Sequence, residues 1–411
     1  MVEDPRLVST RSGFGGLVAL GRQKLGEGEL GPLPVILGLV LIALFFQTKN
    51  DNFLSALNLT NLMIQISSTG VISVGIVLVL LLGEIDLSVG SVSGFCAAIM
   101  AVLNVTHGVG GPASVLVAVL SGTLIGLFFG LMRTKVGVPS FIVTLAGITG
   151  FEGAQLYILG STGTLNINDS FITDLINRLL PVWLGWTLAG LLVGGYVVGI
   201  LLGRRRRVAA GLTVGSWLLV GLRIGVLAVP VLALTALMST DRSRGVIPIQ
   251  GVPLGVVIFL AFVVGFDLIV RKTRFGRHMF AVGGNEEAAR RAGINIDRVR
   301  IATFMLCSTL AACGGVLAAS RLFAVNQSSG GSDTLLNAIA AAVIGGTSLF
   351  GGRGTVWSAL LGSLVIFSIA NGMDLLGYEA SVKFMVTGGV LLAAVTIDAL
   401  ARRGRVAAGR V

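Results

Sequence analysis

Two carboxylic acids stand close together in the stretch GEIDLSVGS, which interrupts a long apolar part of the chain. Glu84 and Asp86 flank Ile85, so on an extended turn their side chains would point the same way. Two interpretations are open. Asp86 and Ser88 are residue types that cap helix starts, which indicates a tight turn before a helix. Alternatively, carboxylates near membrane depth are costly and mark a transport pathway or an interface.

A second polar stretch, FGRHMFAVGGNEEAARRAGINIDRVR at 275–300, lies between two apolar runs. Asn285 is a good N-cap, two glutamates follow it in the first turn, and two arginines come near the end. Gly293 suits the left-handed position after a C-cap. These signals predict a helix over 286–292, which is too short to be stable alone. Asp297 is predicted to be the N-cap of the membrane helix that follows. The helix either lies on headgroups or docks into a partner's groove.

A third stretch, from Gly345 to Gly354, is rich in glycine and carries Arg353. Its glycines either permit close helix packing or let a loop enter the membrane and line a gate. Arg353 is a candidate partner for the carboxylates of the first stretch. Sequence alone does not decide between these interpretations.

No stretch has the pattern of a catalytic or metal site. The chain contains no G-x-x-x-x-G-K-[ST], no G-x-S-x-G and no H-E-x-x-H motif. Cys96, Cys307 and Cys313 lie in apolar runs and are expected to be small buried hydrophobic residues. We therefore expect a protein that is not an enzyme and that binds no metal.

The elements that must position these stretches are membrane helices. The 411 residues are 54% hydrophobic and 12% charged, whereas soluble domains carry about 25% charged residues. We predict an all-α polytopic membrane protein with about 10–12 transmembrane helices, including broken or re-entrant segments. Apolar runs long enough to be candidates lie near 33–47, 62–82, 87–105, 112–132, 140–159, 181–202, 210–238, 252–270, 301–320, 335–350, 355–376 and 381–399.

The basic residues predict how the chain is oriented. With both termini in the cytoplasm, most of the 30 lysines and arginines fall in cytoplasmic segments, as the positive-inside rule requires. We therefore explain the net charge of +11 by the orientation of the chain in the membrane and not by binding of nucleic acid. We expect a cytoplasmic tail over 1–32, a transmembrane domain over 33–399 with a cytoplasmic loop at 271–300, and a basic tail over 400–411. We expect a multi-pass protein of the cell (inner) membrane.

The three stretches together resemble a known family. GRHMFAVGGNEEAARRAGIN resembles the coupling segment of permease subunits in bacterial ABC sugar importers of the ribose/xylose type. GEIDLSVGSVSG and AIAAAVIGGTSLFGGRGTVWSALLG (338–362) resemble two more of its motifs. The additional apolar sequence at 181–238 and Glu84 are similar to the xylose-type branch. The resemblance implies that an ATPase docks on Gly276, Arg277, Gly283, Gly284, Asn285, Glu286, Ala288, Ala289, Gly293 and Ile294.

The resemblance also implies partners and a cargo. An ABC-type ATP-binding subunit would bind ATP and Mg, an extracytoplasmic binding protein would deliver a sugar, and the permease would form a homodimer in the lipid bilayer. This chain would itself bind no cofactor. A pentose such as xylose is the expected cargo, with a nucleoside or another small carbohydrate as alternatives. Outside the family, an ion-coupled secondary transporter is the alternative function.

The resemblance is incomplete at one position that bears on the pathway. Where family members often carry E-L-D before AIAA, this chain has Leu335, Leu336 and Asn337, so the charges are lost. The pathway and gating candidates are Glu84, Asp86, Ser88, Asn337, Gly345, Gly346, Gly351, Gly352 and Arg353.

Overall fold

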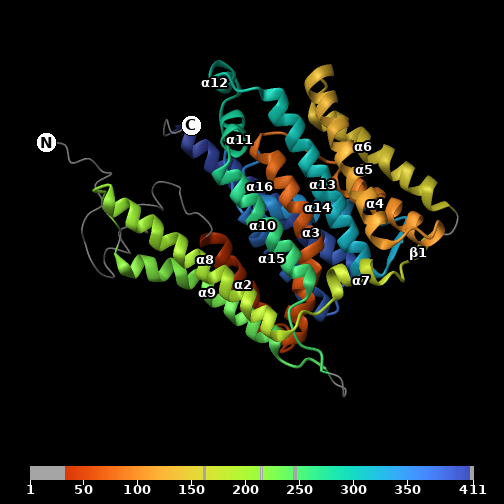
Figure 1. Cartoon of the computed structure of the whole chain (residues 1–411), viewed down its shortest axis with the longest axis horizontal. Coiled ribbons are helices and arrows are strands. Elements are labelled where there is room, and N and C mark those ends of the chain that lie inside the picture. The colour runs from red at the N-terminus through yellow and green to blue at the C-terminus, as the bar shows by residue number, and fades with distance from the viewer. Residues whose placement is uncertain (1–32, 161–162, 213, 215, 244–247, 408–411) are drawn as a thin grey trace. The chain divides into compact units, whose positions relative to one another are not determined.

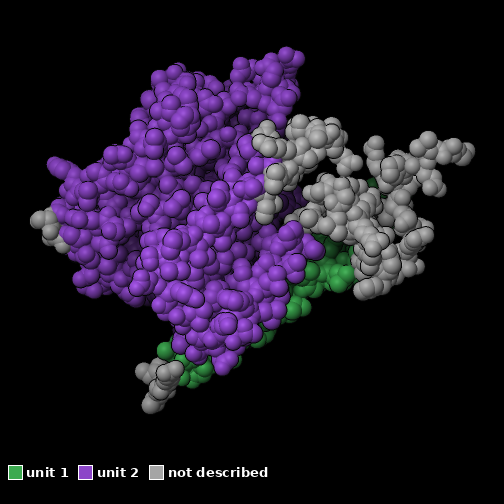
Figure 2. Space-filling view, turned by 180° about the vertical axis from the view of Figure 1, so that it is seen from behind, with its two compact units in different colours: residues 1–31, 180–252, 403–411 green, residues 32–179, 253–402 purple. Residues whose placement is uncertain are grey.

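The computed structural model describes residues 33–160, 163–212, 214, 216–243 and 248–407 (Figure 1). The chain divides into two compact units, coloured separately in Figure 2. Unit 1 includes residues 180–252, and unit 2 comprises residues 32–179 and 253–402. The predicted tail over 1–32 and residues 408–411 lie outside the described residues.

Helices make up nearly all of both units, and the predicted all-α class is confirmed. The only named strands in the described residues are β1 (Thr164–Asn166) and β2 (Ala324–Asn326), which pair antiparallel. The helices are α2 (Leu33–Lys49), α3 (Ala56–Leu81), α4 (Val89–Ala101), α5 (Gly111–Leu131), α6 (Ser140–Leu159), α7 (Ser170–Asn177), α8 (Val182–Ala209), α9 (Trp217–Ser239), α10 (Leu254–Lys272), α11 (Arg274–Gly284), α12 (Glu286–Arg291), α13 (Ile296–Leu322), α14 (Ser332–Ile344), α15 (Trp357–Leu375) and α16 (Ala380–Ala407). The π-helical turns η1 (Val102–Thr106) and η2 (Met132–Val136) extend α4 and α5.

Nine helices in the described part of the chain are long and apolar enough to cross a membrane. Three shorter apolar helices, α2, α14 and the first part of α16, bring the total to the twelve predicted runs. The predicted run at 210–238 begins as a helix only at Trp217, because Gly211 ends α8 with a φ of 68° and Ser216 caps α9. With 13 residues, α14 is about 20 Å long and does not span a hydrocarbon core of about 30 Å.

The centre of unit 2 is α13, which packs against α3, α4 and α5 (Figure 1). The contact with α5 depends on three glycines spaced four residues apart, Gly122, Gly126 and Gly130. A Cβ on any of them would lie 2.4 to 2.7 Å from atoms of α13. Small residues at this spacing let membrane helices approach closely. Cys96 and Cys307 are buried in the described part of the chain, as the sequence predicted, whereas Cys313 is partly exposed.

The loops of unit 2 gather at two ends. One end carries the turn at 82–88 between α3 and α4, the end of α5, and the segment from α11 to the start of α13. The other end carries the β1–β2 pair and α7, whose N-cap Asp169 accepts a hydrogen bond from the N–H of Gly111 at 2.9 Å. The three stretches that could do chemistry are found at the first of these ends.

Unit 1 contains the helical hairpin of α8 and α9, joined by residues 210–216. Arg204 to Arg207 occupy the last two turns of α8, and Pro230 lies inside α9. Most of the surface of both helices is exposed in the described structure. Such apolar, exposed helices are suited to contact with lipid.

Candidate functional site

The short predicted helix is confirmed as α12, which ends one residue earlier than predicted. Oδ1 of Asn285 accepts a hydrogen bond from the N–H of Ala288 at 2.9 Å, so the residue caps the helix as expected. Gly293 has a φ of 78° and closes the C-terminal end. Ala289 is 4% exposed, whereas Ala288 is exposed. One face of α12 is thus packed on the chain itself, and the opposite face is open.

Two details of this segment differ from the sequence prediction. A further helix, α11, precedes α12, and its N-cap Thr273 accepts a hydrogen bond from the N–H of Gly276. The N-cap of α13 is Asn295, whose Oδ1 accepts from the N–H of Arg298 at 3.0 Å, so the prediction of Asp297 was wrong. Asp297 lies in the first turn, where its charge favours the helix start.

Backbone contacts bring the three polar stretches together in one place, which we name the junction: residues 81–88, 283–300 and 351–353. The N–H of Gly352 donates to the carbonyl oxygen of Leu81 at 2.9 Å. A Cβ on Gly283 would lie 1.8 Å from that same oxygen, so only glycine allows the approach. Gly351 has a φ of 83°, a conformation that side chains disfavour. The glycines of the second and third stretches therefore lie against the end of α3.

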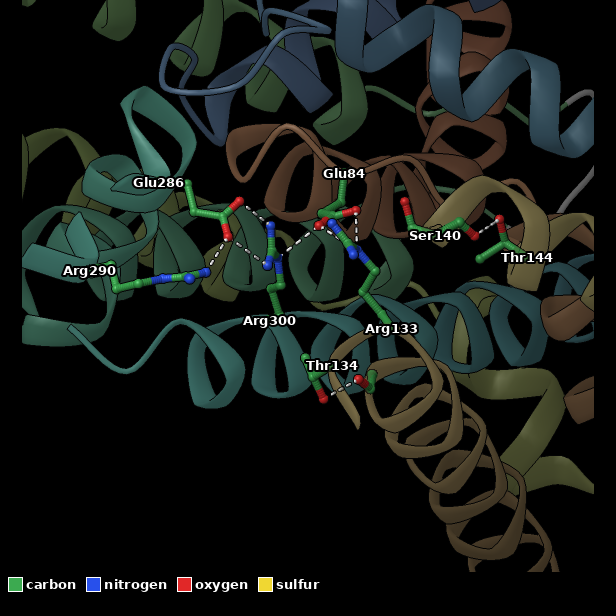
Figure 3. Close-up of polar contacts among 9 residues, drawn as sticks. Glu84, Arg133, Thr134, Ser140, Thr144, Glu286, Arg290 and Arg300 are labelled. Atoms are coloured by element: carbon green, nitrogen blue, oxygen red, sulfur yellow. Dashed lines mark hydrogen bonds and ion pairs between the residues drawn. The ribbon is translucent and has the colours of Figure 1, made fainter. Parts of the chain in front are cut away.

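Ion pairs connect the same elements (Figure 3). Oε1 of Glu84 lies 2.9 Å from Nε of Arg133 and 2.8 Å from Nε of Arg300. A terminal nitrogen of Arg300 lies 2.7 Å from Oε2 of Glu286 on α12. Arg290 reaches the other oxygen of Glu286 at 3.0 Å. The carboxylate of the first stretch is thus linked to the α12 helix through one arginine, which lies on α13.

The burial of this network varies along its length. The side chains of Glu84 and Arg300 are 7% and 11% exposed, whereas that of Glu286 is 41% exposed. Hydrogen bonding by Arg300 lowers the pKa of Glu286, against a smaller opposing effect of desolvation. A paired carboxylate at the end of α3 avoids the cost that an isolated buried charge would carry.

Asp86 has a different environment from Glu84. Its Oδ1 accepts hydrogen bonds from the N–H and the hydroxyl of Ser88, at 2.9 and 2.6 Å. Ser88 is the N-cap of α4, so this arrangement agrees with the interpretation of a structured helix start. Oδ2 of Asp86 is buried and has no hydrogen-bond partner among the described residues. The two carboxylates therefore have separate partners, Ser88 for Asp86 and the two arginines for Glu84.

The remaining predicted residues fall into separate places. In the glycine-rich loop, a Cβ on Gly345 would lie 1.9 Å from the carbonyl oxygen of Ser358, so this glycine serves the close packing of α14 on α15. Gly346 has a φ of 104° and turns the chain after α14. The carbonyl oxygen of Arg353 accepts a hydrogen bond from the N–H of Ser348 at 3.0 Å. Among the pathway candidates, Asn337 lines a cavity.

That cavity has a volume of about 310 Å³ and lies within unit 2. Its wall includes Gln65 of α3, Ser93 of α4, Arg321 of α13, and Asp333 and Asn337 of α14. The loop at 326–330 forms part of the rim beside the β1–β2 pair. Amide, hydroxyl and charged groups around a space of this size suit a small polar molecule with several hydroxyls.

Sequence reasoning missed the two arginines that pair with Glu84. Arg133 and Arg300 carry no local signal that separates them from the other basic residues next to membrane spans. Glu84 offered the available clue, because a carboxylate at the end of an apolar helix needs a cation. Within the described residues, no group of three or more His, Cys, Asp or Glu side chains is placed to hold a metal ion.

The fold and the junction define a multi-pass membrane component whose polar segment is held against the ends of its core helices. Comparison with known proteins gives the family. Residues 58–395 match the family described as branched-chain amino acid transport system / permease component. The chain belongs to this permease family, and its members are transport components and not enzymes. No solved structure matches the chain.

Several named relatives agree with the predicted resemblance. The chain is 36% identical to a xylose transport system permease of Escherichia coli K12 over 398 residues, which cover 96% of both chains. It is 34% identical to a xylose permease of Haemophilus influenzae over 91% of this chain and 98% of the relative. A ribose import permease of Bacillus subtilis is 31% identical over 90% of this chain and 94% of the relative. The predicted resemblance to sugar-importer permeases is therefore confirmed.

Proposed function

We propose that this chain is the translocation-pore subunit of an ATP-driven importer of a pentose such as xylose. The observation that carries the proposal is the junction, where the exposed helix α12 is linked to the ends of α3 and α13 through Glu286, Arg300 and Glu84. The names of the relatives support the cargo, since the first ones are xylose permeases. The ion-coupled alternative gains no support from these relatives.

The open face of α12 is the proposed docking surface for a separate ATPase. Glu287 and Arg291 are 64% and 79% exposed, and they pair with each other at 3.2 Å along the helix. Ala289 on the opposite face anchors the helix to the chain. The ATPase would bind ATP and Mg, so this chain needs no cofactor of its own.

Movement of the docked ATPase would reach the membrane core by two routes. The first is the backbone contact between Gly283 and the end of α3. The second is the ion pair from Glu286 through Arg300 to Glu84. Two packed routes would let α12 act as a lever on the core helices.

The orientation follows from the same proposal. The junction end would face the cytoplasm, in agreement with the basic residues near it. The cavity lined by Asn337 would lie toward the opposite side, where an extracytoplasmic binding protein delivers the sugar. A second copy of the chain would complete the pore in the inner membrane. The hydroxyls of a pentose would hydrogen-bond to the polar wall of the cavity during transit.

The proposal is tested by blocking the open face of α12. In the variant Glu287→Arg with Ala288→Trp, both changed residues are exposed and Ala289 is retained. The matched control is Glu379→Arg with Ala380→Trp, which alters the same two residue types at the exposed start of α16. Each protein is purified from detergent-solubilised membranes of its native host, and copurifying P-loop ATPases are identified by mass spectrometry.

We expect an ATPase to copurify with the wild type and the control, and to be lost from the α12 variant. Xylose uptake should fall in parallel. Absence of any ATPase from the wild type, or equal retention by both variants, would overturn the coupling proposal.

A further inference from the structure

The cavity that would carry the sugar has one wall that is not helical. Asn326, Ser328, Ser329 and Gly330 line it from the end of β2 and the loop that follows, whereas its other lining residues belong to helices. We name residues 326–331 the rim loop. A binding site on a loop is less precise than one on helices unless other residues hold the loop in place. The contacts of the rim loop show which residues do so.

The side chain of Gln155 on α6 bonds to the rim loop. Its Nε2 donates hydrogen bonds to the carbonyl oxygens of Asn326 and Ser329, both at 3.0 Å, and lies 3.4 Å from that of Gln327. Gln155 is 1% exposed and lies four residues before the end of α6. Because an amide oxygen would be repelled by these carbonyls, the NH₂ group must face the loop. One buried amide thus attaches the loop to a helix that lies far away in the sequence.

Glycines let the rim loop lie directly on α4. A Cβ on Gly94 would lie 2.0 Å from the carbonyl oxygen of Ser329, and a Cβ on Gly90 would lie 2.8 Å from that of Gly330. Gly330 itself has a φ of 72°, a conformation that side chains disfavour. The loop is therefore in contact with α4 and hydrogen-bonded to α6.

The rim loop also has bonds of its own. Oδ1 of Asn326 accepts a hydrogen bond from the N–H of Ser328 at 2.9 Å, and the N–H of Asn326 donates to Oγ of Ser329 at 3.0 Å. The N–H of Gly331 donates to the carbonyl oxygen of Ser328 at 3.2 Å. An asparagine that bonds two residues ahead in this way forms a compact turn. The turn fixes its own shape, so the bonds from Gln155 are needed to fix its position.

We propose that Gln155 is a positioning residue for sugar binding, which holds the rim loop where the cavity fits a pentose. This inference rests on the proposed function, because it takes the cavity to be a binding site for the sugar. Gln155 does not line the cavity, so it acts through the loop. Without its bonds the polar groups of the loop would no longer be held opposite those of α3, α13 and α14. The affinity for the sugar should then fall, although every lining side chain is retained.

The test measures how well a sugar protects a cysteine in the cavity. Thr334→Cys places a thiol on the α14 wall, outside the rim loop, and Cys313→Ala removes a partly exposed native thiol. The full-length protein is purified in detergent, and the reaction of the new thiol with a maleimide is followed at increasing concentrations of D-xylose or D-ribose. Sucrose serves as the osmotic control. The two measured quantities are the sugar concentration that gives half-protection and the maximal protection.

Two variants of Gln155 and one control are compared on this background. Gln155→Leu leaves no donor, whereas Gln155→Glu keeps the shape and offers at most one O–H in place of two N–H groups. The matched control is Asn177→Leu. Nδ2 of Asn177 donates to the carbonyl oxygens of Thr173 and Ser320, at 3.0 and 2.9 Å, and Asn177 does not line the cavity. The control therefore removes the same kind of bond from the same end of unit 2.

We expect Gln155→Leu to raise the half-protection concentration about fivefold or more, and Gln155→Glu to raise it less, with maximal protection close to that of the wild type. Asn177→Leu should lower the unfolding temperature and leave half-protection unchanged. A purely structural role of Gln155 would have that same result. Unchanged half-protection in Gln155→Leu, or an equal rise in Asn177→Leu, would overturn the proposal. If Gln155→Leu does not fold, Gln155→Glu decides in the same way.

Failure of this inference can be told apart from failure of the proposed function. If neither pentose protects the thiol with Gln155 intact, the cavity is not a binding site for the sugar and the inference is wrong. The importer proposal is decided separately, by whether an ATPase copurifies through α12.

Discussion

Arg300 is the side chain on which the junction network depends, and its replacement gives the sharpest test of the structure. Arg300→Gln keeps a polar side chain but removes the charge that lies between Glu84 and Glu286. Removing one partner of a buried ion pair costs about 3–5 kcal/mol when the remaining charge is left alone. Here Arg133 stays 2.9 Å from Glu84, so we expect a loss of about 2–3 kcal/mol in the free energy of unfolding.

Arg290→Gln is the matched control. Arg290 bonds to the same carboxylate of Glu286, at 3.0 Å, but its side chain is 65% exposed. An exposed pair at this helical spacing is worth about 0.3–0.5 kcal/mol. Both variants remove a bond to Glu286, but Arg300→Gln also removes the pair with Glu84, and the Arg300 side chain is the more buried one.

The free energy of unfolding is measured by titrating the purified protein with a denaturing detergent in mixed micelles, followed by tryptophan fluorescence. A double variant, Glu84→Gln with Arg300→Gln, leaves no isolated buried carboxylate and should lose less than the sum of the single variants. If Arg300→Gln costs no more than Arg290→Gln, the network does not stabilise the junction and the argument from burial is refuted.

Three further predictions concern the segment around α12. Gly283→Ala should destabilise the protein and reduce transport, because the new Cβ would lie 1.8 Å from a backbone oxygen. Gly284→Ala should be close to neutral, because a Cβ there would meet no atom within 4 Å. Thermal unfolding and uptake measurements compare the two variants. Asn285→Ala should cost about 1 kcal/mol by removing the cap of α12, and faster hydrogen exchange confined to this helix would report it. The hydrogen bond with Arg300 lowers the pKa of Glu286, so the stabilisation that this carboxylate gives is complete above its ordinary pKa of 4.5 and is lost as the pH falls through the lowered pKa. Unfolding midpoints should therefore be constant from about pH 6 to 8 and fall in acid. A Glu286→Gln variant should lose that acid dependence.

Features set by local sequence were predicted well. The cap at Asn285, the glutamates after it and Gly293 all act within one or two helical turns, and α12 formed where they indicated. Apolar runs located the membrane helices for the same reason, since hydrophobicity is a property of each segment alone.

Features set by distant contacts were not predicted. Arg300 and Glu84 are far apart in the sequence, and nothing local marks their pairing. The helix α11 was missed because Gly283 and Gly284 argue against a helix by propensity, although close approach to α3 requires Gly283. Between Asn295 and Asp297, both good cap residues, the sequence offers no means to choose.

The backbone contact at the junction has a mechanical consequence. Where Gly283 and Gly352 contact the end of α3, no side chain lies between the backbone segments. A layer of side chains can accommodate a small displacement by changing rotamers, whereas a direct contact between backbone segments cannot. A displacement of α12 would therefore be transmitted to α3 with little loss of amplitude. The distance that a docked ATPase moves α12 would then determine the distance that α3 moves.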